Sequence, residues 1–106
     1  MAWRVPVAKP DIGQAEVHAV QAVAASGWIT QGDRVRELEV AFAQLCGTEH
    51  AVATATGTAA LHVALAALGV GPGDDVITTP LSCIASANPI LFTGAAYYLP
   101  RLPIAH

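Results

Sequence analysis

The chain has 106 residues, of which 54% are hydrophobic and only 12% charged, and its formal net charge is −3. Typical soluble domains are about 45–50% apolar and about 25% charged, so this chain has an excess of apolar surface. Its five Lys and Arg residues are scattered, which argues against the basic footprint of a nucleic-acid-binding protein. The longest apolar stretch, residues 59–70, is too short for a membrane-spanning helix and is interrupted by His62 and Gly69.

The first ten residues form an extended, proline-marked leader in our interpretation. They have neither the continuous apolar region nor the cleavage pattern of a secretory signal peptide, so we expect a cytoplasmic protein. Cys46 and Cys83 are far apart and no Cys-x-x-Cys pair is present, which favours reduced thiols over a zinc site or a disulfide framework. At this length we expect one domain at most.

An amphipathic helix is predicted to follow the leader. Asp11 is expected to cap it, with Gln14 at the third helical position completing a capping box. The helix is expected to run to about Ala25, because Gly27 is placed to adopt the left-handed conformation that ends helices.

A loop is expected over residues 28–33, followed by a second amphipathic helix capped by Asp33 and ended by Gly47. Its apolar residues recur at intervals of three and four positions: Val35, Leu38, Phe42 and Leu45. This spacing is typical of a helix with one buried face.

Strands and helices alternate in the second half of the chain. The expected elements are a strand at 51–54, a turn at 56–58, a helix at 59–68, a strand at 76–79 and a helix at 84–92. This order predicts βαβ units with a mostly parallel sheet, and therefore an α/β fold.

Prolines modify this prediction at two places. Pro89 lies inside the last expected helix, so we expect a kink or a short helix there. Residues 95–106 form an atypical tail in which Pro100 and Pro103 argue against a central strand.

The turn at Thr56–Thr58 is the most informative local feature. It joins an expected strand to an expected helix, where the first helical amides are unpaired and the helix dipole is positive. Gly57 permits close approach of a phosphate, and the two hydroxyls can add hydrogen bonds. On spacing alone, however, a threonine at this position is more often only a helix cap.

Three segments taken together change that balance. They are residues 26–32 (SGWITQG), 56–62 (TGTAALH) and 71–80 (GPGDDVITTP). In order and spacing they resemble the DegT/DnrJ/EryC1/StrS family of sugar aminotransferases, and the resemblance extends from about Pro10 to Gly94.

The resemblance implies a pyridoxal 5′-phosphate (PLP) enzyme with the aspartate aminotransferase type I fold. Relatives of this kind are usually homodimers that move an amino group from glutamate to a keto sugar on a nucleotide. Residues 1–106 would then be a single incomplete domain, the N-terminal portion of the PLP-binding large domain.

The resemblance also assigns residues. Gly57 and Thr58 match positions that hold the cofactor phosphate, and Thr56 stands where serine is more usual. Cys83 stands where an aromatic residue commonly stacks on the cofactor ring, and a thiol offers less contact area. The loop that contains Trp28 and Thr30 resembles one that reaches the substrate.

Catalysis by PLP requires a lysine that forms a Schiff base with the cofactor and an acidic partner for the pyridinium nitrogen. The only lysine, Lys9, lies in the leader, and Asp74 and Asp75 lie in an expected turn. We therefore expect a truncated chain that is inactive alone, with its acidic partner downstream of His106. His62 is expected to be a packed histidine.

Two alternatives remain open at this stage. The first is a non-catalytic phosphate-binding or interaction module whose apolar faces dock on a full-length relative. The second is an independent small α/β domain that binds another phosphate ligand.

Overall fold

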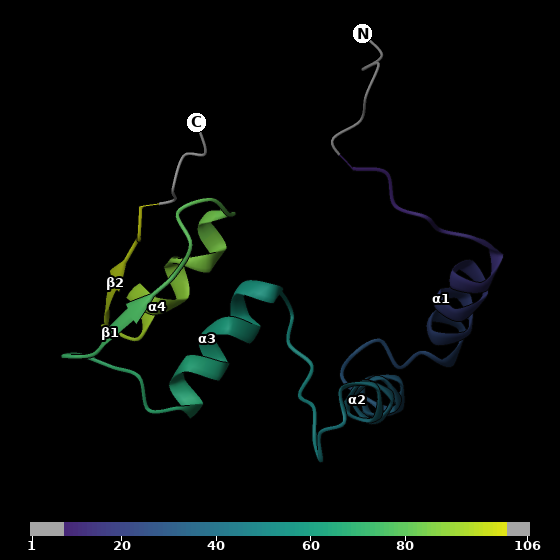
Figure 1. Ribbon diagram of the computed structural model, residues 1–106. Helices are drawn as coiled ribbons and strands as arrows, with labels where there is room; N and C mark the ends of the chain where they lie inside the picture. The colour runs from purple at the N-terminus through teal and green to yellow at the C-terminus, as the bar shows by residue number, and fades with distance from the viewer. Residues whose placement is uncertain (1–7, 102–106) are drawn as a thin grey trace, which may run out of the picture. The chain divides into compact units, whose positions relative to one another are not determined.

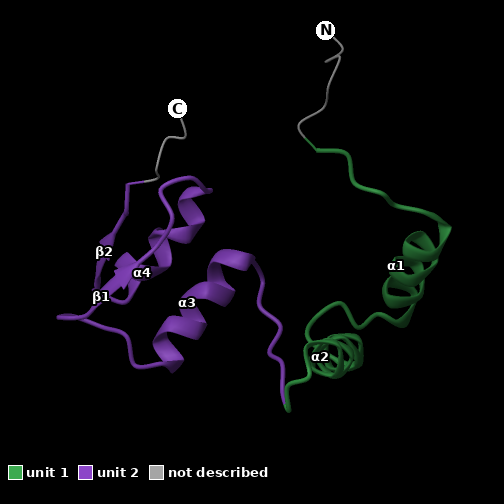
Figure 2. Cartoon of the chain, in the orientation of Figure 1, with its two compact units in different colours: residues 1–49 green, residues 50–106 purple. Residues whose placement is uncertain are grey.

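The computed structural model describes residues 8–101, so the predicted leader at 1–10 and the tail at 95–106 lie partly outside the described residues. The chain divides into two compact units, one ending at Glu49 and one beginning at His50 (Figure 2). Each unit is described by itself.

The N-terminal unit begins with helix α1, Gln14–Ser26. Gly13 is its N-cap, and the Gly13 amide donates to Glu16 Oε2 at 2.7 Å. The carboxylate also accepts from its own backbone amide. The bond from the Glu16 amide, and next the bond from the Gly13 amide, hold the pKa of Glu16 below its ordinary value. Gly27, with φ of 72°, ends the helix as expected.

The predicted cap of α1 was wrong by two residues. Asp11 precedes the helix, and Gln14 is its first residue rather than its third. Both Asp11-x-x-Gln14 and Gly13-x-x-Glu16 have capping-box spacing, but only the second places a negative charge in the first turn, where the helix dipole favours it.

Helix α2, Asp33–Cys46, completes the N-terminal unit. Its N-cap is Gly32, so Asp33 is the first helical residue and not the cap that the sequence predicted. Gly47, with φ of 67°, ends it as expected. Ala43 is the buried residue of this helix.

The described part of the C-terminal unit, residues 50–101, contains five elements: α3 (Gly57–Ala67), β1 (Asp75–Ile77), the 3₁₀-helix η1 (Ile84–Ser86), α4 (Asn88–Phe92) and β2 (Ala96–Tyr98). The two strands are parallel neighbours, and α4 lies on the connection between them (Figure 1). This arrangement confirms the predicted α/β class with a parallel sheet and a βαβ unit.

Pro89 determines how the predicted helix at 84–92 is built. The segment is divided into η1 and α4, which confirms the expected short helix. Pro89 lies in the first turn of α4, where its missing amide costs no helical hydrogen bond.

The core of this unit lies around α4. Pro89, Ile90 and Ala95 are buried, and α4 packs against α3, η1 and β2. The rings of His62 in α3 and Phe92 in α4 meet edge to face with centroids 5.5 Å apart. His62 is therefore a packed histidine, as the sequence predicted.

The turn before β1 packs against the turn before β2. A Cβ on Gly94, whose φ is 82°, would lie 3.1 Å from Pro72 Cγ. The Ala96 amide also donates to the Asp74 carbonyl at 2.9 Å, which starts the pairing of the strands.

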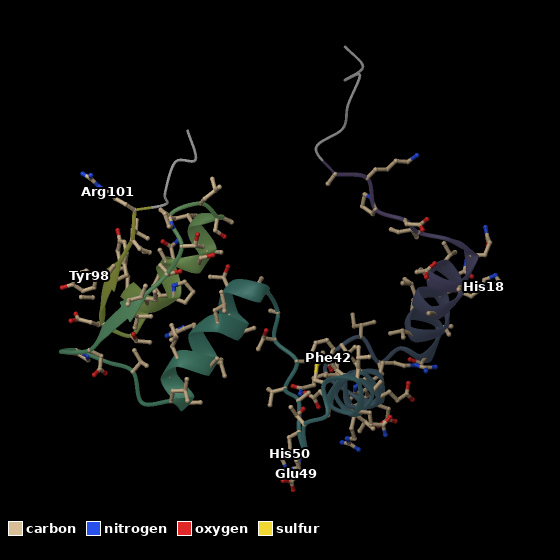
Figure 3. All side chains as sticks on the ribbon, viewed as in Figure 1. His18, Phe42, Glu49, His50, Tyr98 and Arg101 are labelled. Carbon is tan, nitrogen blue, oxygen red and sulfur yellow. The ribbon has the colours of Figure 1, made fainter. Side chains whose placement is uncertain are left out.

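The strand predicted at residues 51–54 was wrong. Residues 51–54 form no strand in the described chain, where the sheet consists of β1 and β2. In the tail, Ala96–Tyr98 forms a strand that ends before Pro100 and pairs with β1 in a two-stranded sheet, so it is not a central strand in the described chain. Figure 3 shows the Tyr98 side chain pointing away from α4, consistent with its exposure.

Among residues 8–101, none of the helices is both long enough and apolar enough to span a bilayer.

Candidate functional site

The predicted phosphate turn lies at the N-terminus of α3. Thr56 is the N-cap, and its hydroxyl accepts from the Ala59 amide at 3.1 Å. The Thr56 carbonyl accepts from the Ala60 amide at 3.0 Å. The side chain and the carbonyl of Thr56 are thus both used to start the helix.

The amides of Ala59 and Ala60 thus have acceptors, and the first two amides of α3, those of Gly57 and Thr58, come before them. Within residues 8–101 neither amide has an acceptor, as expected for the first two positions of a helix. Gly57 is exposed, and a Cβ placed on it would meet no atom within 4 Å. Two amide donors, a nearby hydroxyl and open space at the positive end of a helix fit a phosphate group.

Thr54 adds a contact that the sequence interpretation did not include. Its hydroxyl donates to the Thr56 carbonyl at 3.0 Å. In a trans peptide the carbonyl and the following amide point in opposite directions, so fixing the Thr56 carbonyl also fixes the direction of the Gly57 amide. The signal in the sequence was a second threonine two positions before the turn.

Cys83 lies in the same unit as the phosphate turn. It is the N-cap of η1, its carbonyl accepts from the Ser86 amide at 2.9 Å, and its thiol is free and exposed. The element η1 packs against α3. Two further bonds fix this segment: the Ser82 and Ser86 hydroxyls lie 2.8 Å apart, and Thr78 Oγ1 donates to the Ser86 carbonyl at 3.4 Å.

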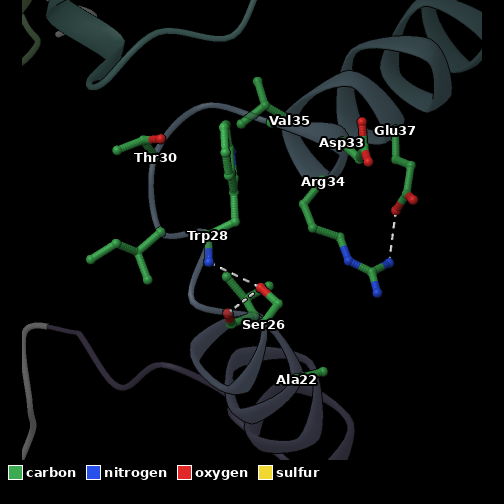
Figure 4. Close-up of a pocket in the computed structure, with 11 residues that line it drawn as sticks. Ala22, Ser26, Trp28, Thr30, Asp33, Arg34, Val35 and Glu37 are labelled. Atoms are coloured by element: carbon green, nitrogen blue, oxygen red, sulfur yellow. Dashed lines mark hydrogen bonds and ion pairs between the residues drawn. The ribbon is translucent and has the colours of Figure 1, made fainter.

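Trp28 and Thr30 lie in the N-terminal unit, in the predicted loop between α1 and α2. They line a pocket of about 570 Å³ formed by the end of α1, this loop and the start of α2 (Figure 4). The structure thus groups the predicted site residues into two sets, Thr56–Thr58 with Cys83 in one unit and Trp28 with Thr30 in the other.

Comparisons with known proteins agree on one family. The model of the DegT/DnrJ/EryC1/StrS aminotransferase family matches residues 10–99. Spr1654 of Streptococcus pneumoniae, described as a sugar aminotransferase and solved in its PMP form, is 37% identical with a TM-score of 0.84, over 92% of this chain and 24% of its own.

Two further solved structures give the range of the similarity. The aminotransferase from Psychrobacter cryohalolentis is 38% identical with a TM-score of 0.79, over 85% of this chain and 23% of its own. The E. coli GDP-4-keto-6-deoxy-D-mannose-3-dehydratase, with bound hydrated PLP, is 27% identical with a TM-score of 0.80, over 89% of this chain and 26% of its own. The chain spans about a quarter of the length of these structures.

The family model covers most of the chain, and the parallel βαβ unit agrees with it. The chain belongs to the DegT/DnrJ/EryC1/StrS aminotransferase family.

Proposed function

We propose that this chain supplies the phosphate-holding part of a PLP site in a sugar aminotransferase. In the whole protein, the reaction would transfer an amino group from glutamate to a keto sugar on a nucleotide, in the cytoplasm and within a homodimer. The observation that carries the proposal is the pair of unpaired amides, Gly57 and Thr58, beside open space at the start of α3.

Each residue of the turn has a distinct role in this proposal. The amides of Gly57 and Thr58 donate to phosphate oxygens, and the Thr58 hydroxyl adds a third donor. Thr56 and Thr54 hold the turn in place. When bound, the cofactor supplies the electron sink that amino transfer requires.

We make two further assignments, one in each unit. Cys83 lies beside the cofactor ring, supported by the packing of η1 against α3. Trp28 and Thr30 contact the sugar substrate, supported by the pocket that they line.

Sequence identity favours amino transfer over dehydration. The chain is 37–38% identical to the two aminotransferases but 27% identical to the 3-dehydratase. We therefore assign the transferase reaction to the whole protein.

We propose that residues 1–106 do not catalyse this reaction alone. The only lysine of the sequence, Lys9, is exposed and precedes α1, outside the strand, turn and helix segments that resemble the family's cofactor site. No keto sugar should be aminated when the purified chain is supplied with PLP and glutamate. Turnover in that assay, lost on replacing Lys9 by Arg, would contradict this part of the proposal.

A non-catalytic interaction module is the second candidate. Large apolar side chains remain exposed in both units, with Leu45 at 82% and Leu68 at 80%. Apolar surface of this extent is typical of protein contacts. Under this candidate the phosphate turn would still bind, but the chain would act only after docking on a longer relative.

The test uses pyridoxamine 5′-phosphate, because it has no aldehyde to react with Lys9 or the N-terminus. Replacing Gly57 by Ala adds a methyl group where the protein has open space, so the fold is retained while the phosphate is obstructed. We expect calorimetry to show binding weakened about five- to 140-fold in Gly57→Ala, since this range corresponds to an overpacking cost of about 1–3 kcal/mol.

Gly71→Ala is the matched control. Its added Cβ would meet only the Thr93 carbonyl at 3.8 Å, an ordinary contact, and it lies outside the phosphate turn. If the wild type, Gly57→Ala and Gly71→Ala bind pyridoxamine 5′-phosphate with equal affinity, the phosphate does not bind at the start of α3.

A further inference from the structure

We infer that Gly32 is the positioning residue of the pocket between α1 and α2. Because Gly32 has no Cβ, the Trp28 indole can lie against the start of α2 and form a wall of the pocket. The inference rests on the proposed function only for the ligand that this wall contacts, a sugar ring.

Backbone conformation does not explain the glycine. Gly32 has φ of −164° and ψ of −153°, an extended conformation that any residue adopts. Space does explain it: a Cβ on Gly32 would lie 2.5 Å from Trp28 Nε1 and 2.7 Å from Trp28 Cδ1. These distances are shorter than van der Waals contact, so any larger residue must displace the indole.

The start of α2 gives a second reason to assign the glycine at position 32 to the placement of Trp28. The Gly32 carbonyl accepts from the amides of Val35 and Arg36 at 3.1 and 3.2 Å, so Gly32 is the N-cap. Serine, threonine, aspartate or asparagine would add a side-chain hydrogen bond at this position. The helix begins without such a bond, because the indole of Trp28 occupies the space that a capping side chain needs.

Trp28 is held by further bonds on both sides. Its Nε1 donates to the Gln31 carbonyl at 3.0 Å, which closes the loop on itself. Its backbone amide donates to Ser26 Oγ at 3.2 Å, and that hydroxyl donates to the Val23 carbonyl at 2.7 Å. Figure 4 shows the indole reaching from the end of α1 toward the start of α2.

The chemistry of the pocket selects the ligand. Trp28 and Ile29 give an apolar wall, and the pocket also contains one guanidinium, Arg34, and two carboxylates, Asp33 and Glu37. Arg34 Nη1 is already paired with Glu37 Oε2 at 2.8 Å. Asp33 Oδ1 lies 3.9 Å from Arg36 Nη1, so the described cations at this pocket are already paired with carboxylates and none is left over for a phosphate. A sugar ring offers an apolar face to the indole and hydroxyl groups to the carboxylates.

The test observes Trp28 directly. In a Trp3→Phe background the indole N–H of Trp28 gives the only such NMR signal, and we expect cross-peaks from this proton to the Gly32 Hα protons. In Gly32→Ala these cross-peaks should be lost, and exchange of the indole proton with water should accelerate as the bond to Gln31 is broken.

Gly13→Ala is the control, because Gly13 is the other N-cap glycine of a long helix. Its Cβ would meet only the flexible Glu16 Oε2 at 3.3 Å. The Trp28 signal should be unchanged in this variant. A Trp28 signal that is also unchanged in Gly32→Ala would overturn the inference.

The ligand is tested with UDP-glucose against UDP. Only UDP-glucose should shift the Trp28 and Thr30 signals, and Gly32→Ala should weaken this binding at least several-fold. In a Trp28→Leu background the same substitution should have no further effect. Undiminished binding by Gly32→Ala would contradict a positioning role.

If the wild type shows the ring contact but no response to UDP-glucose, the sugar part of the inference is wrong. Binding of pyridoxamine 5′-phosphate at α3 is measured separately, so a failure of the proposed cofactor site can be told apart from a failure of the inference about Gly32.

Discussion

The two units of the chain are stabilised by contacts of different range. In the N-terminal unit the polar contacts are largely local, such as Gly13 with Glu16 and Arg34 with Glu37, each three positions apart. In the C-terminal unit the Thr78 amide donates to the Tyr98 carbonyl, and β1 pairs with β2 across the intervening α4. The phosphate turn therefore belongs to the unit that is stabilised by contacts between residues far apart in the sequence.

A substitution in the core should show this difference most strongly. Ile90 is 2% exposed, and Ile90→Ala is expected to lower the free energy of unfolding by about 2–5 kcal/mol. Leu45, in the N-terminal unit, is 82% exposed, so Leu45→Ala should cost less than about 0.5 kcal/mol. Urea unfolding followed by circular dichroism measures both, and similar costs would contradict the comparison.

The site itself should respond to a smaller change. Thr54→Val removes the hydroxyl that holds the Thr56 carbonyl but keeps the shape of the side chain. We expect binding of pyridoxamine 5′-phosphate to weaken about two- to tenfold, the range that a net hydrogen bond of about 0.5–1.5 kcal/mol allows.

Thr54→Ser retains the hydroxyl and serves as the control for this substitution. It should restore most of the affinity that Thr54→Val loses. Undiminished binding by Thr54→Val, together with a loss in Thr54→Ser, would show that the methyl group, and not the hydrogen bond, supports the turn.

The smallest expected effect concerns pH and the N-terminal unit. Because the pKa of Glu16 in the folded chain lies below its ordinary value, the carboxylate contributes its full stabilisation above about pH 4.5. This contribution is lost as the pH falls through the lowered pKa. The helical circular dichroism signal of the wild type should decline over that range.

Glu16→Gln keeps a capping-box residue but removes the charge. Its helical signal should lack the part of the decline that belongs to Glu16. Identical pH profiles for the two proteins would show that the Gly13 to Glu16 bond does not stabilise α1.

The helices were the most predictable part of the fold. The glycines that end them, Gly27 and Gly47, are local signals that the structure confirms. The apolar spacing located the helices, but Leu38, Phe42 and Leu45 of α2 are exposed rather than buried. The starts were less predictable, because neighbouring residues competed for the cap and neither Asp11 nor Asp33 caps a helix.

Strands were harder to predict because a strand needs a partner. Residues 51–54 have a typical strand composition but form no strand among the described residues, whereas Ala96–Tyr98 becomes a strand through pairing with β1. Similarly, the sequence showed Gly57 and Thr58 at a helix start, but not the Thr54 hydroxyl that fixes the turn. The contact of Trp28 with Gly32 also depends on how the loop folds.

The central claim is that the start of α3 holds the cofactor phosphate. The most direct measurement is an amide NMR titration of the chain with pyridoxamine 5′-phosphate, compared with pyridoxamine. We predict that the largest shifts fall on the Gly57 and Thr58 amides, and only with the phosphorylated compound. Shifts centred elsewhere, or the same shifts with pyridoxamine, would contradict the claim.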